Sequence, residues 1–242
     1  MHILTCRKAL KVPPPFHSIG DVAAGLAALD RQFRSTRDLR GLFVMAYVAT
    51  TGTIAQWIEQ GVFGDCAAMT RYVIAFANEY RRALADRVAG NHSSVPIAWQ
   101  QSFDACDERS GVFQCLMLGI NAHMKRDLPY GVIAAGIDVD STDCYEDYVR
   151  IDDVLRLNMP LVRRRIADAY GAELSFTQRW FGGLADAGMA RDFKRARQDS
   201  WEFAQLLARA ETESARALVD RTIEEHVAIE GQKILGLKDA AA

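Results

Sequence analysis

VFQCLMLGINAHMKRD, residues 112 to 127, contains no charged side chain before Lys125. A helix that is apolar on most of its sides is normally buried on most of its sides. A second run of this kind extends from Gly41 to Ile58, between the charged residues Arg40 and Glu59. Two buried helices need further helices packed around them. These two runs therefore predict a layered helical bundle.

The rest of the chain also has helical periodicity. Apolar residues recur three and four positions apart in almost every segment, and no run alternates between apolar and polar residues as a half-buried strand does. With 242 residues, the chain is long enough to bury a sizeable core in one domain. We therefore predict an all-α fold, a single multi-helix bundle of about eight or nine helices with two largely buried central helices.

Proline positions predict where the chain leaves helical geometry. Pro13-Pro14-Pro15 favours an extended arm over residues 1–17, lying on the body or on a neighbouring subunit, with residues 18–242 forming the helical domain. Because a residue before proline disfavours helical angles, the helix with the 112–127 sequence is expected to end at Leu128. Pro160 is expected to kink or break a later helix that reaches Tyr170. A short helix is predicted from Phe176 to Phe181.

Charge and cysteine content exclude several classes of protein. The 29 Lys and Arg residues nearly balance the 31 Asp and Glu residues, so the net charge is −2 and no nucleic-acid partner is expected. The five cysteines are odd in number and never form a C-x-x-C motif. This favours a reducing, cytoplasmic location without a disulfide framework or a thiolate zinc site. Glycine-rich phosphate loops and a G-x-S-x-G elbow are absent from the sequence, so no nucleotide cofactor is expected.

The run from Gly41 to Ile58 has about the length of a membrane span, but its second half is polar. Its polar and small residues are Thr50, Thr51, Gly52, Thr53 and Gln56. We therefore interpret this run as a buried core helix and expect no membrane span. The N-terminus also lacks the basic start, apolar core and cleavage site of a signal peptide.

His123 and Asp127 are the residues most indicative of chemistry. They are four positions apart and so share one helix face, and Asp127 stands at the negative end of the helix dipole, where a carboxylate needs compensation. In one interpretation, Asp127 accepts a hydrogen bond from one ring nitrogen of His123, and the other nitrogen acts as an acid or base. In a second, both residues bind a metal ion. In a third, His123 is a hydrogen-bonded core residue.

The metal alternative requires ligands from other helices. The candidates, besides His123 and Asp127, are Asp104, Asp152 and His226. The paired Glu-x-x-His spacing of di-iron bundles is absent from the sequence. We therefore expect no cofactor, and a divalent metal ion is the alternative.

A ligand pocket is predicted from aromatic residues, which could equally be core residues. Its predicted lining residues are Trp99, Phe103, Tyr130, Tyr148 and Trp201. The expected ligand is a small apolar metabolite, with Asn121 and Arg150 positioning its polar groups.

Three motifs give the chain a resemblance to known proteins. They are Asn121-Ala122-His123-x-x-x-Asp127-Leu128-Pro129, Asp147-x-x-Arg150 with Asp152 downstream, and Ser200-Trp201 followed by Ala204 and Leu207. In these motifs the chain resembles an uncharacterised bacterial family of all-helical proteins, a domain of unknown function. The resemblance extends from about residue 20 and implies a helical fold. A remoter similarity links the His and Asp spacing to zinc-dependent phospholipases C, whose additional histidines this chain lacks.

Three functions follow from these observations. The first is a small-molecule enzyme of the lyase, cyclase or hydrolase type that uses acid/base chemistry, with His123 as acid or base and Asp127 orienting it. The second is a metal-assisted hydrolase that uses the same residues. The third is a non-catalytic protein that binds a ligand or a partner. A homodimer is compatible with all three.

Overall fold

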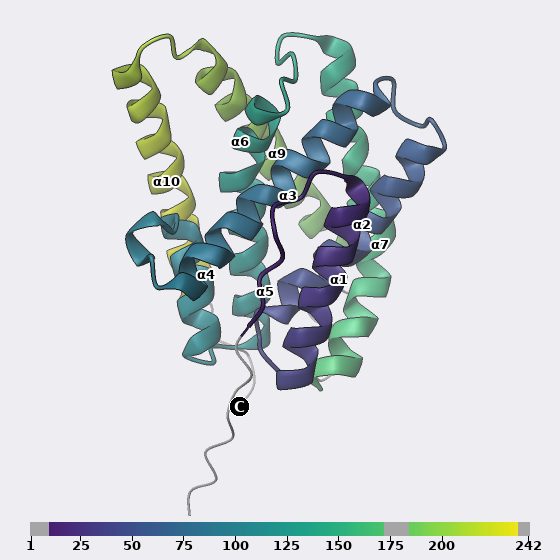
Figure 1. Cartoon of the computed structure of the whole chain (residues 1–242), viewed down its shortest axis with the longest axis vertical. Helices are drawn as coiled ribbons and strands as arrows, with labels where there is room; N and C mark the ends of the chain where they lie inside the picture. Colours follow the sequence, from purple (N-terminus) through teal and green to yellow (C-terminus); the bar gives the residue numbers. More distant parts are fainter. Residues whose placement is uncertain (1–9, 172–183, 237–242) are drawn as a thin grey trace, which may run out of the picture.

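The computed structural model describes residues 10–171 and 184–236, which contain helices and no strand. This confirms the all-α prediction (Figure 1). The helical elements are α1 (Ile19–Thr36), α2 (Gly41–Glu59), α3 (Cys66–Ala89), the 3-10 turn η1 (His92–Ser94), α4 (Ile97–Asp107), α5 (Val112–Asn121), the π-helical segment η2 (Ala122–Asp127), α6 (Leu128–Ala134), α7 (Thr142–Tyr170), α9 (Leu184–Arg209) and α10 (Glu213–Leu235). The helix predicted over residues 176–181 lies outside the described residues.

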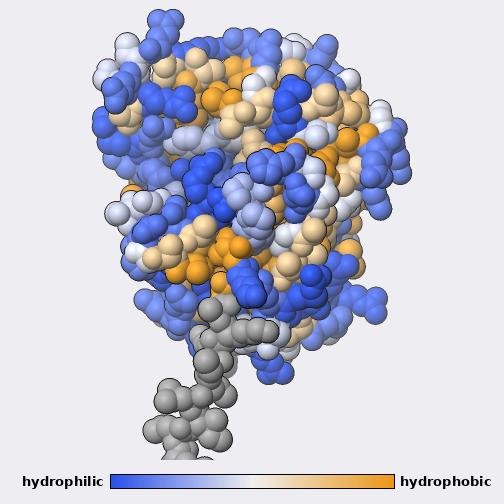
Figure 2. All heavy atoms as spheres, in the orientation of Figure 1, coloured by the Kyte–Doolittle hydropathy of each residue, from blue (hydrophilic) through white to orange (hydrophobic). Residues whose placement is uncertain are grey.

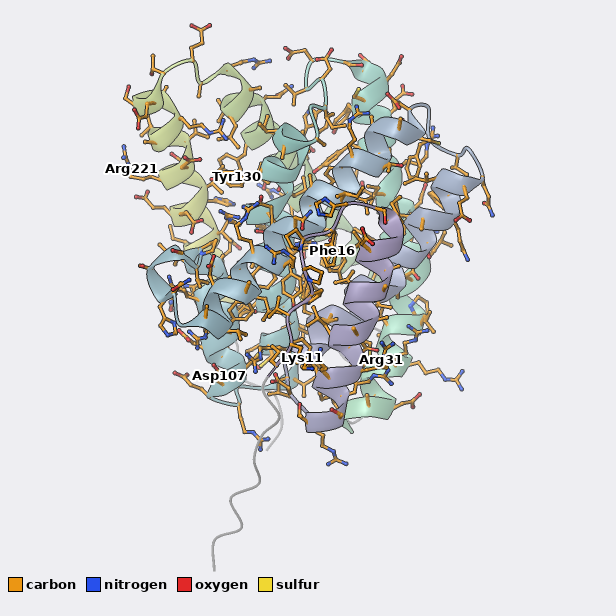
Figure 3. All side chains as sticks on the ribbon, in the orientation of Figure 1. Lys11, Phe16, Arg31, Asp107, Tyr130 and Arg221 are labelled. Carbon is orange, nitrogen blue, oxygen red and sulfur yellow. The ribbon has the colours of Figure 1, made fainter. Side chains whose placement is uncertain are left out.

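The described part of the N-terminal arm, residues 10–17, is extended and lies on the body of the same chain. Its Phe16 is 3% exposed. The backbone N–H of Phe16 donates to Oδ1 of Asn78 on α3, and Nδ2 of Asn78 donates back to the Phe16 carbonyl, both at 3.0 Å. Lys11 pairs in the same way with Gln32 on α1. In Figure 3, Lys11 and Phe16 mark the course of this segment beside α1.

Helix α2 is one of the two central helices, as predicted. Its first half is buried, including Leu42, Phe43, Val44 and Met45, and it packs against α1, α3, α5 and α7. Among the helices that the structure describes, α2 alone has the length and hydropathy to cross a membrane, and half of that apolar window is buried inside the bundle. Packing within the bundle accounts for the apolar character of this helix.

Helix α5 is the second central helix, and its continuation differs from the prediction. The chain does not leave helical geometry at Leu128, because the π-helical segment η2 connects α5 to α6. Pro129 lies in the first turn of α6, where its missing N–H leaves no hydrogen bond unmade. A π-helical turn is also wider than an α-helical turn, which gives the proline ring room.

Of the kink or break expected at Pro160, the break does not occur. Helix α7 continues from Thr142 to Tyr170 with Pro160 inside it. Val154 and Ile166, on either side of the proline, are both buried in the core. Packing on both sides holds the two parts of α7 together as one helix, despite the lost hydrogen bond.

Charged and apolar side chains are interspersed on the face of the molecule drawn in Figure 2. Large apolar side chains that remain exposed include Leu157 and Leu161 on α7, Leu206 on α9, and Leu218 and Ile229 on α10. The homodimer and the cytoplasmic location stay predictions.

Candidate functional site

His123 and Asp127 are in contact inside the bundle. Both belong to η2, and Nδ1 of His123 lies 2.9 Å from Oδ2 of Asp127. His123 is 4% exposed and Asp127 is completely buried. The π-helical segment therefore carries a buried imidazole and carboxylate pair. Such segments frequently occur at functional sites.

Asp127 accepts hydrogen bonds from three side chains. Nε1–H of Trp99 donates to Oδ1 and Oδ2 at 3.1 and 2.9 Å, and Nη1–H of Arg126 donates to Oδ1 at 3.2 Å. Because a carboxylate can only accept, Nδ1 of His123 is the donor in the third interaction. Arg126 also places a positive charge beside this buried carboxylate. Asp127 does not stand at the negative end of a helix dipole, because the chain remains helical from η2 into α6.

Arg126 in turn binds two further carboxylates. Its Nη1 donates to Glu79 of α3 at 2.7 Å, and its Nε donates to Glu224 of α10 at 3.3 Å. Glu79 also pairs with Arg82. The buried charge of Asp127 thus belongs to a network of opposite charges that links η2 to α3 and α10, and this network holds the carboxylate in place.

Burial lowers the pKa of His123 below 6.5, and the hydrogen bond and charge of Asp127 oppose this shift without cancelling it. The imidazole is therefore neutral at pH 7, with its proton on Nδ1. Its Nε2 then carries a lone pair, and no hydrogen-bond partner for this atom exists among the described residues. An unpartnered buried nitrogen with a lone pair can accept a proton from a bound molecule.

Aromatic rings fix the plane of the His123 imidazole. Phe76 of α3 stacks on it with ring centroids 3.7 Å apart and an interplanar angle of 14°. The rings of Tyr47 and Phe43, both on α2, lie with their centroids 4.4 and 5.2 Å away. These contacts and the bond to Asp127 leave the ring one orientation, with Nε2 on the side away from the carboxylate.

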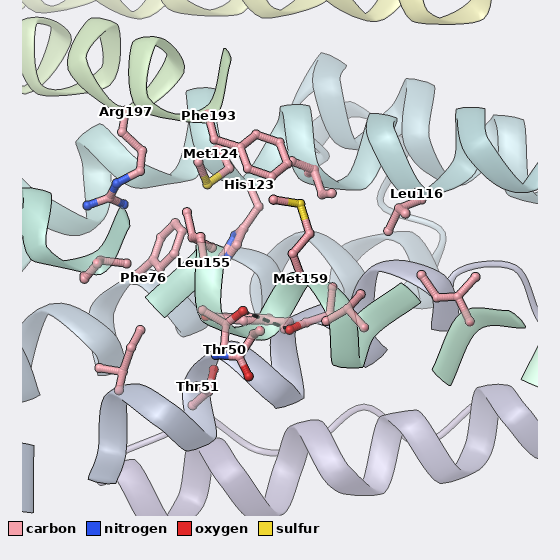
Figure 4. A pocket seen from close by; sticks show the side chains of 18 of the residues that line it. Thr50, Thr51, Phe76, Leu116, His123, Met124, Leu155, Met159, Phe193 and Arg197 are labelled. Atoms are coloured by element: carbon pink, nitrogen blue, oxygen red, sulfur yellow. Dashed lines mark hydrogen bonds between the residues drawn. The ribbon is translucent and has the colours of Figure 1, made fainter. Parts of the chain in front are cut away.

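A mainly apolar cavity of about 120 Å³ lies beside His123, between α2, α3, α5, α7 and α9. Figure 4 shows His123 reaching into the middle of it, with Thr50 and Thr51 on the opposite wall. Four of its lining residues have buried side-chain polar atoms without a hydrogen-bond partner in the described chain: Tyr47 (Oη), Thr51 (Oγ1), Tyr72 (Oη) and His123 (Nε2). Such a concentration of unpaired polar atoms at an apolar cavity is typical of a ligand site.

Phe193 of α9 lies in the wall of this cavity. It also lines two open clefts, of about 450 and 530 Å³. Leu155 and Met159 of α7 form the wall toward the first cleft, and Ile120 and Met124 form the wall toward the second. A small molecule would enter where these side chains move, and the two methionines are flexible enough to do so.

The other two predicted catalytic residues do not line the cavity. Nδ2–H of Asn121 donates to the Val227 carbonyl of α10 at 3.1 Å, which ties α5 to α10. Arg150 donates to the Val62 carbonyl and lies 3.9 Å from Asp147. Both side chains therefore connect elements of the bundle.

The five aromatic residues predicted to line the pocket also lie elsewhere. Trp99 donates a hydrogen bond to Asp127, and the ring of Phe103 stacks on Trp99 with centroids 5.3 Å apart. Tyr130 donates to Asp220 at 2.8 Å. The remaining two, Tyr148 and Trp201, contact each other beside α9. These residues surround the site as core residues and do not form its wall.

The structure does not bring the candidate metal ligands together. Asp104 pairs with Arg87 at 2.6 Å on the surface, and Asp152 pairs with Arg197 at 2.7 Å. The ring of His226 packs against Phe203 and lines the second surface cleft. Within residues 10–171 and 184–236, no three His, Cys, Asp or Glu residues form a group that could hold a metal ion.

Several lining residues were not identified from the sequence. They are Tyr47, Thr51, Phe76 and Arg197. One signal was available, because polar threonines within a helix predicted to be buried need partners inside the protein. Thr51 is such a residue. The others come from α2, α3 and α9 and meet only through the packing of the bundle.

Comparison with known proteins places the chain in a family. Searches of curated proteins and of solved structures gave no match. A family model described as a family of unknown function (DUF5995) matches residues 19–237, which is most of the chain. This agrees with the resemblance to an uncharacterised all-helical family, and the chain belongs to this family of unknown function, DUF5995.

Proposed function

We propose that this protein is an enzyme that performs acid/base chemistry on a small, largely apolar molecule bound in the cavity beside His123. The observation that carries the proposal is the unpartnered, buried Nε2 of His123 at an apolar cavity, with Nδ1 of the same ring held by a buried carboxylate. This is the arrangement of a general base whose tautomer is fixed by a second residue.

In the proposed reaction, Nε2 of His123 accepts a proton from a C–H or O–H group of the substrate. The resulting imidazolium is stabilised by the ionised Asp127, to which Nδ1–H already donates. The hydroxyl groups of Tyr47 and Thr51 are free to donate to a substrate oxygen on which negative charge develops. The imidazolium then gives this proton from Nε2 to another atom of the substrate or to water, which restores the neutral base.

The metal-assisted alternative has less support. The carboxylate of Asp127 already accepts from Trp99, His123 and Arg126. Only Nε2 of the pair faces the cavity. A metal ion there would have one ligand from this pair, whereas metal sites in proteins generally use three or more. A non-catalytic protein could bind a ligand in the same cavity. The experiment below distinguishes this role from catalysis.

The test uses 5-nitrobenzisoxazole, an apolar compound whose ring opens when a base removes its C–H proton. The nitrogen–oxygen bond breaks in the same step and gives a coloured cyanophenolate, so no co-reactant is needed. Met124 and Met159 line the cavity, and their flexible side chains can move aside to admit this compound. The measured quantity is the rate of colour formation as a function of pH.

We expect wild-type protein to accelerate this elimination with a rate that rises with pH, has a midpoint below 6.5 and then levels off. His123→Gln should lower the rate by about 100-fold or more. His92→Gln, at an exposed histidine on the 3-10 turn, is the matched control and should leave it unchanged. If the His123 variant does not fold, the midpoint of the wild-type pH profile still tests whether a base with a pKa below 6.5 performs the elimination.

The outcome that overturns the proposal is binding without catalysis. If wild-type protein binds fluorobenzene, as measured by fluorine-19 NMR, but His123→Gln leaves the elimination rate unchanged, the cavity belongs to a binding protein. A rate that does not depend on pH near the pKa of His123 would have the same meaning.

A further inference from the structure

The cavity has a distinct polar end, formed by Arg197 of α9 and Tyr72 of α3. We infer that the substrate is a small apolar carboxylate whose carboxylate group lies against Arg197 and Tyr72 while its apolar body extends past His123. This inference rests on the proposed function, in that it takes the same cavity as the substrate site. It adds the chemical class of the substrate.

Arg197 is a buried cation in the wall of an apolar cavity. It is 2% exposed. Its Nε donates to Oδ1 of Asp152 at 2.7 Å, its Nη2 donates to the Tyr148 carbonyl, and its guanidinium carbon lies 4.0 Å from the centre of the Tyr148 ring. These contacts hold the guanidinium in one place, as a binding site requires.

Arg197 retains donor capacity that these contacts do not use. A guanidinium has five N–H groups, and the bonds to Asp152 and to the Tyr148 carbonyl use two of them. Arg197 also lies close enough to the Tyr72 hydroxyl to oppose the rise in the pKa of Tyr72 that burial causes. The side chain of its counter-ion, Asp152, is 25% exposed and lines a surface cleft, so water partly screens that charge. On the cavity side, Arg197 can therefore bind a second anion with little competition.

Tyr72 provides a second donor at the same end of the cavity. It is 2% exposed, its hydroxyl has no partner among the described residues, and its ring stacks on Phe76 with centroids 5.5 Å apart. Burial raises the pKa of Tyr72 above 10, so the hydroxyl keeps its proton at neutral pH. Two donors on different helices, both aimed at one apolar cavity, suit the two oxygens of a carboxylate.

The remaining walls indicate an apolar body of limited size. In the view of Figure 4, Arg197 lies on one side of the cavity, Leu116 on the other and His123 between them. An engineered cavity of about 150 Å³ binds benzene, so about six carbon atoms fit a cavity of about 120 Å³. An ammonium group would find no free carboxylate here, because Asp152 and Asp127 are both occupied.

The test compares hexanoate, hexanamide and hexylamine by isothermal titration calorimetry at pH 7. These compounds share a six-carbon skeleton and differ in the charge of the polar group. We expect hexanoate to bind at least about tenfold more tightly than hexanamide, and hexylamine to show no binding. Decanoate should bind no better than hexanoate, which distinguishes a small carboxylate from a fatty acid.

Substitutions then assign the preference to the two donors. Arg197→Gln should reduce the preference for hexanoate over hexanamide to about twofold or less, and Tyr72→Phe should weaken hexanoate binding about fivefold. Arg209→Gln is the matched control, because this arginine lies on the same helix with its side chain 59% exposed. If Arg197→Gln does not fold, Asp152→Asn replaces it, and removal of this competing anion should strengthen hexanoate binding.

Equal affinity for hexanoate and hexanamide in wild-type protein would overturn the inference, as would a preference that survives Arg197→Gln. Tighter binding of decanoate by about tenfold would overturn the size limit. These outcomes are distinguishable from failure of the proposed function. A hexanoate preference together with no effect of His123→Gln on 5-nitrobenzisoxazole elimination rejects only the acid/base role.

Discussion

The indole Nε1–H of Trp99 donates to both carboxylate oxygens of Asp127, at 3.1 and 2.9 Å, in the interior of the bundle. Neither residue lines the cavity. Their contact nevertheless fixes the carboxylate so that Oδ2 also accepts from Nδ1 of His123. A tryptophan on α4 thus determines which nitrogen of the histidine carries the proton.

Replacement of Asp127 should cost both stability and function. Asp127→Asn removes the negative charge that accepts from Trp99, His123 and Arg126 and places an amide donor among those donors. We expect the free energy of unfolding to fall by about 3 kcal/mol, since hydrogen bonds to a charged, buried group are among the strongest. Urea unfolding followed by circular dichroism measures this change.

Asp104→Asn is the control for that substitution. Its carboxylate is 52% exposed and pairs with Arg87, so the loss should stay below about 1 kcal/mol. Equal effects of the two substitutions would mean that the buried carboxylate is not part of a stabilising network.

The pH dependence of stability should follow from the pKa of His123. Burial holds this pKa below 6.5 in the folded protein, so between that pKa and 6.5 the unfolded chain binds a proton that the folded protein does not bind. The free energy of unfolding therefore falls as the pH falls below 6.5, by up to about 1.4 kcal/mol per pH unit. Above 6.5 this contribution is constant.

Urea unfolding of wild type and His123→Gln over this pH range isolates the effect, because other groups titrate in both proteins. The wild type should lose stability faster than the variant on acidification. If the wild type instead lost stability more slowly than the variant, His123 would be an imidazolium paired with Asp127, with a pKa above 6.5.

Gly119 should not tolerate a methyl group. A Cβ atom at this position of α5 would lie 2.7 Å from Cβ and 2.9 Å from Cγ of Phe43 on α2. The Phe43 ring in turn packs edge-on against His123 with centroids 5.2 Å apart. Gly119→Ala should therefore lower the free energy of unfolding by about 1–3 kcal/mol through overpacking and should displace the imidazole.

Gly52→Ala is the matched substitution in a central helix. A Cβ atom at Gly52 meets nothing within 4 Å, so alanine should be neutral or stabilise α2 by up to about 1 kcal/mol. Thermal unfolding of both variants tests the contrast. Two variants that are equally stable would contradict the close packing of α5 on α2.

Phe193→Ala should open the cavity. This side chain lies between the cavity and both surface clefts. Its removal should raise the association rate of fluorobenzene severalfold, as measured from fluorine-19 NMR line shapes. Leu206→Ala, at a leucine of the same helix that is 49% exposed, should leave the rate unchanged. An unchanged rate in Phe193→Ala would place the entrance elsewhere.

The sequence was sufficient for the fold class because helical periodicity and the two uncharged runs are local properties. It also predicted that His123 and Asp127 share a helix face, because residues four apart do so in any helix. The prediction that the helix ends at Leu128 was wrong, because the rule for residues before proline assumes α-helical geometry. The chain instead avoids the clash at Pro129 with a π-helical turn.

The lining of the cavity could not be predicted from the sequence. Its polar residues Tyr47, Tyr72 and Arg197 come from three different helices. Local spacing is a poor guide to ion pairs as well, because Asp152 binds Arg197, which is 45 residues further along the chain. Such contacts depend on how the helices pack.

The proposed function requires His123 to be a neutral base with its proton on Nδ1 and its lone pair on Nε2. Nitrogen-15 NMR of histidine-labelled protein measures both the tautomer and the pKa, with His123→Gln identifying the signal. We predict the Nδ1–H tautomer at pH 7 and a titration midpoint below 6.5. A proton on Nε2, or an imidazolium at neutral pH, would show that His123 is not the base proposed here.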